Sequence, residues 1–253
     1  MIKGKGKSIC LFSSKGGTGK SLTAINIAGF FAMQGKKVLI VDYDLYFGSI
    51  GLYLNKDYTK TLLNFVSDYV DNKSISLDNY VTKYNDNIYF LPSAKDPRSA
   101  SKVNSKLIDL IIEKSIFYYD YLIIDTMSVL NENNVEVLDS VDLNLFIMNN
   151  DLVNIKNMHN LLTIFDSADK KNYKILLNES INPYKNYFSL YDIKKMLGYN
   201  IDYHLDSKFF IKNIDSYIFD GKIITLDKKF SKNYPKTYKV FDSLLKYMED
   251  ENE

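Results

Sequence analysis

The chain has 253 residues, of which 46% are apolar, and a formal net charge of +1 from 32 basic and 31 acidic side chains. This length and apolar content suffice for one well-packed core, so we expect a single domain over residues 1–253. The balanced charge excludes an overall field that would attract nucleic acid or an anionic membrane, and a single cysteine, Cys10, excludes a disulfide framework.

Short apolar runs alternate along the chain with segments of helical periodicity, which is typical of a mostly parallel, twisted sheet covered by helices on both faces. We expect about seven strands, namely ICLFS, KVLIV, IYFLP, YLIID, LNLFIM, YKILLN and IDYHL. The apolar spacing predicts helices over Leu22–Gln34, along Val103–Ile112, along Leu152–Phe165 and over Ser189–Gly198. No apolar run is long enough to cross a bilayer and no export signal is visible, so we expect a cytoplasmic protein.

A glycine-rich loop joins the first expected strand to the first expected helix. It reads Ser14-Lys15-Gly16-Gly17-Thr18-Gly19-Lys20-Ser21 and continues with Leu22. Glycines let backbone N–H groups converge on phosphates, and the helix N-terminus adds the positive end of its dipole. The loop therefore predicts a nucleotide site in which Lys20 neutralises the β- and γ-phosphates and Ser21 places its hydroxyl on Mg²⁺.

Polar side chains end three further strands, where they can serve phosphoryl transfer, which needs a held metal ion and a positioned water. Asp125 can hold Mg²⁺ through water, and Asp42 and Asp44 lie two residues apart and can both face the phosphates. The competing interpretation is that these last two carboxylates cap the next turn. Asn178 ends its strand with an amide that can pair with the adenine edge, which favours ATP over GTP.

KGGTGKS, with its additional lysine at Lys15, resembles the loop of the MinD/ParA family of deviant Walker ATPases, and VLIVDYD, YDYLIIDT and KILLN resemble further family motifs. The resemblance implies an α/β P-loop NTPase fold, ATP and Mg²⁺ as cofactors, slow ATP hydrolysis and a homodimer that encloses ATP between its subunits. It also implies that Lys15 reaches the phosphates bound by the other subunit, that Asp44 orients the attacking water, and that Asp42 supports the metal shell.

Segments LYFGSIGLYLN, IYFLPSAKDPRSASKV and DTMSVLNENNVEVLDSVDLNLFIMNN resemble the CpaE/TadZ branch, whose members localise and help assemble Tad-type pili. This resemblance predicts a protein partner in a pilus or positioning machinery, and recruitment to the inner face of the membrane or to a cell pole. Two departures stand out. Ser14 replaces a glycine of the general loop pattern, and Met127-Ser128 replace a turn rich in Pro and Gly, which predicts a changed γ-phosphate switch and slower turnover.

Other functions share this nucleotide core. A partition ATPase would bind DNA through the lysine-rich segment 222–239, but Asp227 interrupts it and Arg98 is the one arginine, so DNA is not favoured. A MinD-like membrane cycle would use a basic C-terminal helix, yet the tail 249–253 is acidic, so we expect the helix to pack on the domain. The apolar stripe of this C-terminal helix consists of Tyr238, Phe241, Leu244, Leu245 and Met248.

Of three further classes of protein, one is ranked lower, one is excluded and one is left open. Bacterial tyrosine kinases share the architecture, but their loop lacks the additional lysine and their second motif continues with Arg and Pro where this chain has Tyr46-Phe47-Gly48. An iron–sulfur reductase of the same fold is excluded because Cys10 is the only thiol. A structural landmark that binds nucleotide without turnover stays open.

Overall fold

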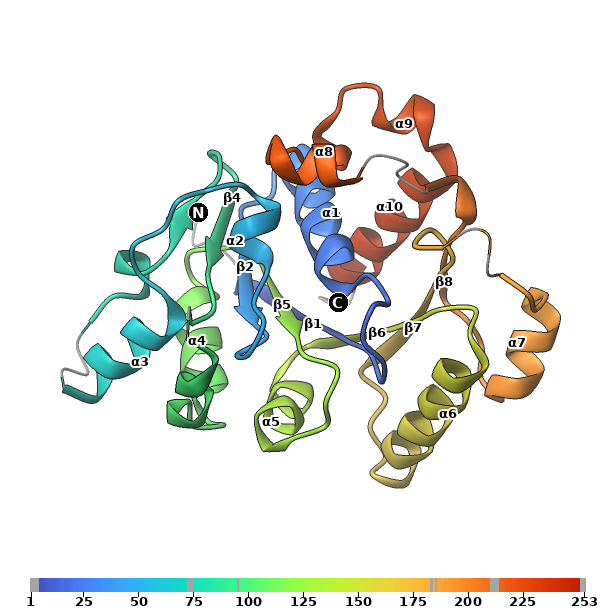
Figure 1. The fold of residues 1–253 in the computed structure, drawn as a ribbon, viewed down its shortest axis with the longest axis horizontal. Helices are drawn as coiled ribbons and strands as arrows, with labels where there is room; N and C mark the ends of the chain where they lie inside the picture. Colours follow the sequence, from blue (N-terminus) through green and yellow to red (C-terminus); the bar gives the residue numbers. More distant parts are fainter. Residues whose placement is uncertain are drawn as a thin grey trace.

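The computed structural model describes residues 5–71, 75–94, 96–182, 184, 186–209 and 214–250. Within these ranges, one eight-stranded sheet has the order β3-β4-β2-β5-β1-β6-β7-β8, and Figure 1 shows it crossing the middle of the molecule. The strands are β1 Lys7–Phe12, β2 Val38–Tyr43, β3 Thr82–Lys83, β4 Ile88–Leu91, β5 Tyr121–Thr126, β6 Leu143–Met148, β7 Tyr173–Asn178 and β8 Tyr203–Leu205. The mostly parallel α/β fold is thereby confirmed.

The seven expected strands are all present, and they pair in parallel. The eighth strand, β3, pairs antiparallel with β4 at the edge of the sheet. It has two residues, too few for an apolar alternation to be visible in the sequence.

Helices cover both faces of the sheet, as expected. They are α1 Lys20–Met33, α2 Ile50–Tyr53, α3 Leu62–Asp71, α4 Leu107–Ser115, α5 Glu132–Ser140, α6 Leu152–Ser167, α7 Leu190–Leu197, α8 Ile214–Phe219, α9 Phe230–Asn233 and α10 Pro235–Asp250. The predicted bounds agree closely except for the stripe that starts at Val103. This residue has an extended backbone after a 3₁₀ turn over Pro97–Lys102, so the helix begins at Leu107.

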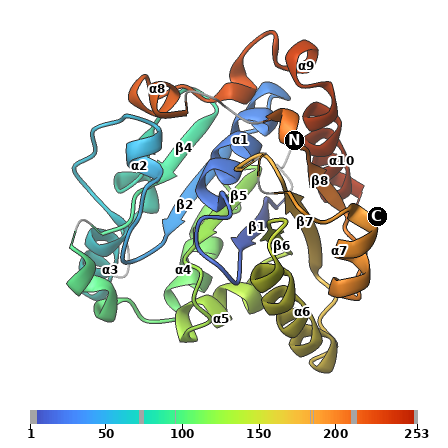
Figure 2. The same cartoon turned by 45° about the vertical axis from the view of Figure 1, so that its right-hand side comes forward.

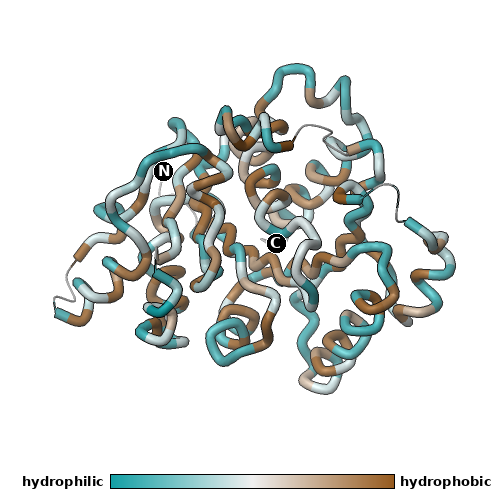
Figure 3. Tube along the Cα trace, in the orientation of Figure 1, coloured by the Kyte–Doolittle hydropathy of each residue, from teal (hydrophilic) through white to brown (hydrophobic). Residues whose placement is uncertain are grey.

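Two apolar cores lie on opposite faces of the sheet because side chains alternate along each strand. Cys10 and Phe12 of β1 join the core under α3 to α7, whereas Ile9 and Leu11 join the core under α1 and α10. Figures 1 and 2 show these helix layers on the two sides of the sheet, and Figure 3 shows the apolar strands between more polar outer segments.

The C-terminal helix α10 packs on the domain, as expected. Phe241, Leu244, Leu245 and Met248 of its apolar stripe are buried and Tyr238 is partly buried. The ring of Phe241 lies 5.9 Å from that of Phe30 in α1. Residues 251–253 of the acidic tail lie outside the described residues. Among the helices that the structure describes, none combines the length and apolar character needed to cross a bilayer.

Candidate nucleotide-binding site

The glycine-rich loop lies between β1 and α1, as the sequence predicts. Gly17 and Gly19 have φ angles of +75° and +85°, in the left-handed region that favours glycine. A Cβ atom on Gly19 would come within 2.5 Å of Ile181 Cδ1 and 2.8 Å of Asn178 Nδ2. Backbone conformation therefore favours glycine at both positions. At Gly19 the close approach of Ile181 and Asn178 also leaves no room for a side chain.

A cavity of about 470 Å³ opens beside this loop. The polar lining residues include Lys20, Ser21 and Asp44, and the apolar ones include Ile181, Phe209 and Ile218. The size of the cavity and this mixed chemistry suit a nucleotide. The lining residues are Gly16, Gly17, Thr18, Gly19, Lys20, Ser21, Leu22, Asp44, Tyr53, Ser128, Ser180, Ile181, Phe209, Ile214, Asp215 and Ile218.

Both lysines of the loop are engaged within the subunit. Lys20 Nζ donates a hydrogen bond of 2.5 Å to Ser128 Oγ, which itself donates to the carbonyl of Lys15 at 3.0 Å. The Lys15 ammonium forms an ion pair of 2.9 Å with Asp151, the N-cap residue of α6. The desolvation that accompanies burial lowers the pKa of Lys20, while the negative charges of Asp125 and Asp44 counteract that shift.

Two buried carboxylates lie next to each other behind the loop. Asp42 on β2 and Asp125 on β5 occupy the same register, and each has one buried oxygen with no hydrogen-bond partner among the described residues. Burial raises the pKa of Asp125 to about 6, although the Ser21 hydroxyl and the Lys20 ammonium both act in the opposite direction. Burial and the charge of Asp125 also raise the pKa of Asp42 well above its ordinary value.

The donor set fits the metal ion that the sequence predicts. Unpaired, buried carboxylate oxygens beside a serine hydroxyl are the hard oxygen ligands that Mg²⁺ prefers, and a cation would satisfy them. Both Asp42 and Asp44 also cap the following turn, which was the competing interpretation. Asp42 Oδ2 accepts from Ile50 N at 2.9 Å, and Asp44 Oδ1 accepts from the backbone N–H groups of residues 46 and 47.

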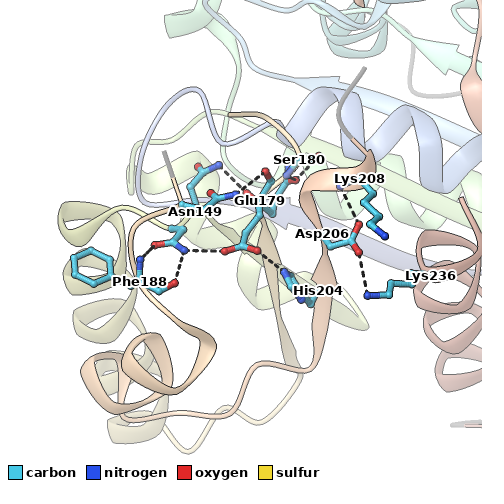
Figure 4. Close-up of polar contacts among 11 residues, drawn as sticks. Asn149, Glu179, Ser180, Phe188, His204, Asp206, Lys208 and Lys236 are labelled. Atoms are coloured by element: carbon cyan, nitrogen blue, oxygen red, sulfur yellow. Dashed lines mark hydrogen bonds and ion pairs between the residues drawn. The ribbon is translucent and has the colours of Figure 1, made fainter. Parts of the chain in front are cut away.

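Asn178 lies against the loop but its amide is used within the protein. Its Nδ2 donates to the carbonyl of Thr18 at 2.9 Å, and its Oδ1 accepts from the Ser180 hydroxyl at 2.6 Å. The residue is 1% exposed, so adenine recognition by this amide remains a prediction that requires its rearrangement. Figure 4 shows the surrounding network, in which Asn149 bonds the carbonyl of Asn178 and Glu179 bonds His204.

Sequence reasoning did not identify Ser128 as a partner of Lys20 or Asp151 as a partner of Lys15. Each follows a strand that ends at the same edge of the sheet as the glycine-rich loop. Asp151 lies three residues after the predicted strand LNLFIM and immediately before the next predicted helix, and a polar residue in such a position is the signal that could have identified it.

A family model described as "AAA domain" matches residues 6–181. An uncharacterized ATP-binding protein of Methanocaldococcus jannaschii is 26% identical over 58% of this chain and 54% of its own. The septum site-determining protein MinD of Synechocystis is 29% identical over 46% of this chain and 43% of its own. The tyrosine-protein kinase YwqD of Bacillus subtilis is 31% identical over 53% and 56%. The chain thus spans about half the length of these curated relatives.

Solved structures share the fold. A ParA family ATPase from Chlorobium tepidum has a TM-score of 0.77 and 20% identity, covering 94% of this chain and 98% of its own. MinD from Pyrococcus horikoshii, complexed with Mg-ADP, has a TM-score of 0.77 and 19% identity over 94% and 95%. The MinC:MinD complex of Aquifex aeolicus has a TM-score of 0.72 and 21% identity, covering 94% of this chain and 96% of its own. Because the family model covers well over half of the sequence, the chain belongs to this AAA domain family.

Proposed function

We propose that the chain is an ATP-driven dimerisation switch that hydrolyses ATP slowly and positions or partitions a cellular assembly. The observation that carries this proposal is a cavity of nucleotide size lined by Lys20, Ser21 and Asp44. The buried Asp125 interacts with Ser21 and Lys20, and Asp42 occupies the same register on the neighbouring strand. The MinD and ParA relatives support it, as does the sequence similarity to an ATP-binding protein. In this proposal residues 1–253 act as one domain.

Each residue has a distinct role in the proposed reaction. Lys20 and the loop N–H groups hold the phosphates of ATP, with Ser14, Gly16 and Leu22 as further contacts. Ser21, Asp42 and Asp125 would hold Mg²⁺, which when bound offsets phosphate charge. Asp44, half-buried in the cavity wall, orients the attacking water.

Lys15 acts on the other subunit of the dimer. The Lys15 ammonium contacts Asp151, and apolar side chains are exposed after β2, after β5 and at the first residue of α6, at the same edge of the sheet. Phe47, Val129 and Leu152 are 80%, 58% and 56% exposed, respectively. Burial of such side chains against a second copy supports dimerisation across this edge.

The protein partner is proposed to belong to a cell-division or partition machinery in the cytoplasm, with recruitment to the inner membrane face or a cell pole. The MinC:MinD complex supports a protein partner. The narrower CpaE/TadZ assignment to pilus assembly rests only on the sequence resemblance of the segments 45–55, 88–103 and 125–150. DNA is not favoured as a partner, because Lys222 and Lys236 of the lysine-rich segment already pair with Asp220 and Asp206.

A nucleotide-bound landmark without turnover is the second candidate. The specific observation in its favour is that Asp44 caps the turn after β2 through one carboxylate oxygen, which leaves it less free to orient water.

The molar mass in solution, measured with ADP and with ATP plus Mg²⁺ beside phosphate release from the same samples, tests the proposal. We expect a monomer with ADP, a dimer with ATP and slow phosphate release. A constant mass without phosphate release would contradict the switch and support the landmark, and no nucleotide binding at all would refute both.

A further inference from the structure

The segment after β5 borders the cavity beside the glycine-rich loop. Ser128 lines this cavity, and its hydroxyl lies 2.5 Å from the ammonium of Lys20. Lys20 is the lysine that we propose to hold the β- and γ-phosphates. In the free protein, the serine therefore occupies one of the donor directions that a phosphate oxygen would need.

The hydrogen-bond inventory of Ser128 determines what it can bind. A serine hydroxyl has one hydrogen and two acceptor lone pairs. Its hydrogen is directed to the carbonyl of Lys15 at 3.0 Å, so only its lone pairs face Lys20. A phosphate oxygen is an acceptor and cannot use those lone pairs. The hydroxyl is consequently arranged as an alternative to phosphate, not as a ligand for it.

A buried side-chain amide holds the backbone on both sides of Ser128. Asn134 Nδ2 in α5 donates to the carbonyls of Met127 at 3.1 Å and Val129 at 2.6 Å, on either side of the serine. Asn134 is itself fully buried. The fold therefore sets the backbone position from which the Ser128 hydroxyl reaches Lys20.

We propose that Ser128 is a positioning residue that stands in for a phosphate oxygen in the nucleotide-free protein. It keeps the partly buried ammonium of Lys20 hydrogen-bonded and ties it to the backbone of Lys15. When nucleotide binds, Lys20 transfers one hydrogen bond from the serine to a phosphate. Ser128 thus competes internally with nucleotide and lowers its affinity. This inference rests on the proposed binding of nucleotide at the glycine-rich loop.

The expected effect has a defined sign. A hydrogen bond to a charged group is stronger than one between neutral groups, but water can replace the serine next to Lys20 and recover part of its contribution. Ser128→Ala should therefore raise the affinity for ADP about three- to tenfold. The affinity for ATP should rise by a similar factor, because the competing contact is lost in both cases.

Calorimetric titration with Mg-ADP and Mg-ATP, on wild type and variants, tests the inference. Ser128→Thr retains the hydroxyl and should bind like wild type, and Ser101→Ala, an exposed serine remote from the cavity, controls for the substitution itself. Unchanged affinity in Ser128→Ala would overturn the proposal. Weaker ATP binding with unchanged ADP binding would also overturn it, because Ser128 would then contact the γ-phosphate. Failure of the wild type to bind either nucleotide would instead refute the proposed function.

Discussion

Asp42 and Asp125 occupy the same register on the neighbouring strands β2 and β5, and each has a buried carboxylate oxygen without a hydrogen-bond partner in the described chain. Burial raises the pKa of both carboxyl groups, the charge of Asp125 raises the pKa of Asp42 further, and the charge of Asp44 acts on both in the same direction. Two such groups side by side are costly to ionise, and a bound cation would satisfy their unpaired oxygens.

This arrangement predicts how stability depends on pH in the absence of metal. The pKa of Asp125 is about 6 in the folded chain and 3.8 for an ordinary aspartate, so protonated Asp125 favours folding below pH 3.8. That contribution, of about 3 kcal/mol, is lost as the pH rises through 6. In EDTA, the free energy of unfolding of Asp125→Asn should therefore exceed that of wild type increasingly between pH 4 and 6. A difference that stays constant from pH 4 to 7, in urea titrations, would contradict this.

Asp151→Asn should promote dimerisation. Asparagine keeps the N-cap of α6, where Asp151 Oδ1 accepts from Asn154 N at 2.9 Å, but it removes the charge that holds Lys15. Both partners of this ion pair are about two-fifths exposed, so its loss should change stability by less than about 1 kcal/mol. We expect the ATP-dependent dimer to form at two- to fivefold lower protein concentration, an effect of about 0.5–1 kcal/mol.

Light scattering across a protein dilution series with ATP and Mg²⁺ measures this shift. Lys15→Ala is the matched control, because it breaks the same ion pair while removing the proposed contact to the other subunit. It should bind nucleotide as a monomer. If Asp151→Asn dimerises less readily than wild type, Asp151 stabilises the dimer itself and does not restrain Lys15.

Gly19→Ala should cost both stability and nucleotide binding. Its φ of +85° is strained for alanine, and the new Cβ would meet Ile181 and Asn178. Gly35, which follows α1, has a φ of +81° with no atom within 4 Å of a Cβ, so Gly35→Ala isolates the backbone strain at about 1–2 kcal/mol. Thermal denaturation with and without ADP compares the two variants. Equal melting temperatures would show that the loop moves away from Ile181 and Asn178.

Much of the fold follows from local patterns in the sequence. The parallel strands, α1 and the capped helix α7, in which Ser189 and Asp192 form a capping box, are each encoded within a few consecutive residues. The glycine-rich loop belongs to the same class. The partners of its lysines do not, because Ser128 and Asp151 are more than 100 positions away. They meet the loop only because β5 and β6 flank β1, an order that periodicity does not specify. The contacts of Asn178 depend on the same strand order.

Asp44 separates the switch from the landmark. Asp44→Asn preserves an oxygen that can accept from the backbone of Phe47, so the turn after β2 is kept while the negative charge is lost. If Asp44 orients the attacking water, this variant should still dimerise with ATP but release phosphate about 10²–10⁴-fold more slowly, the usual range for a positioned acid or base. Asp44→Ala should trap the same dimer and also loosen the turn. Phosphate release at the wild-type rate in Asp44→Asn would remove the carboxylate charge from the reaction. Phosphate release at the wild-type rate in both variants would leave Asp44 only the structural role that its hydrogen bonds show.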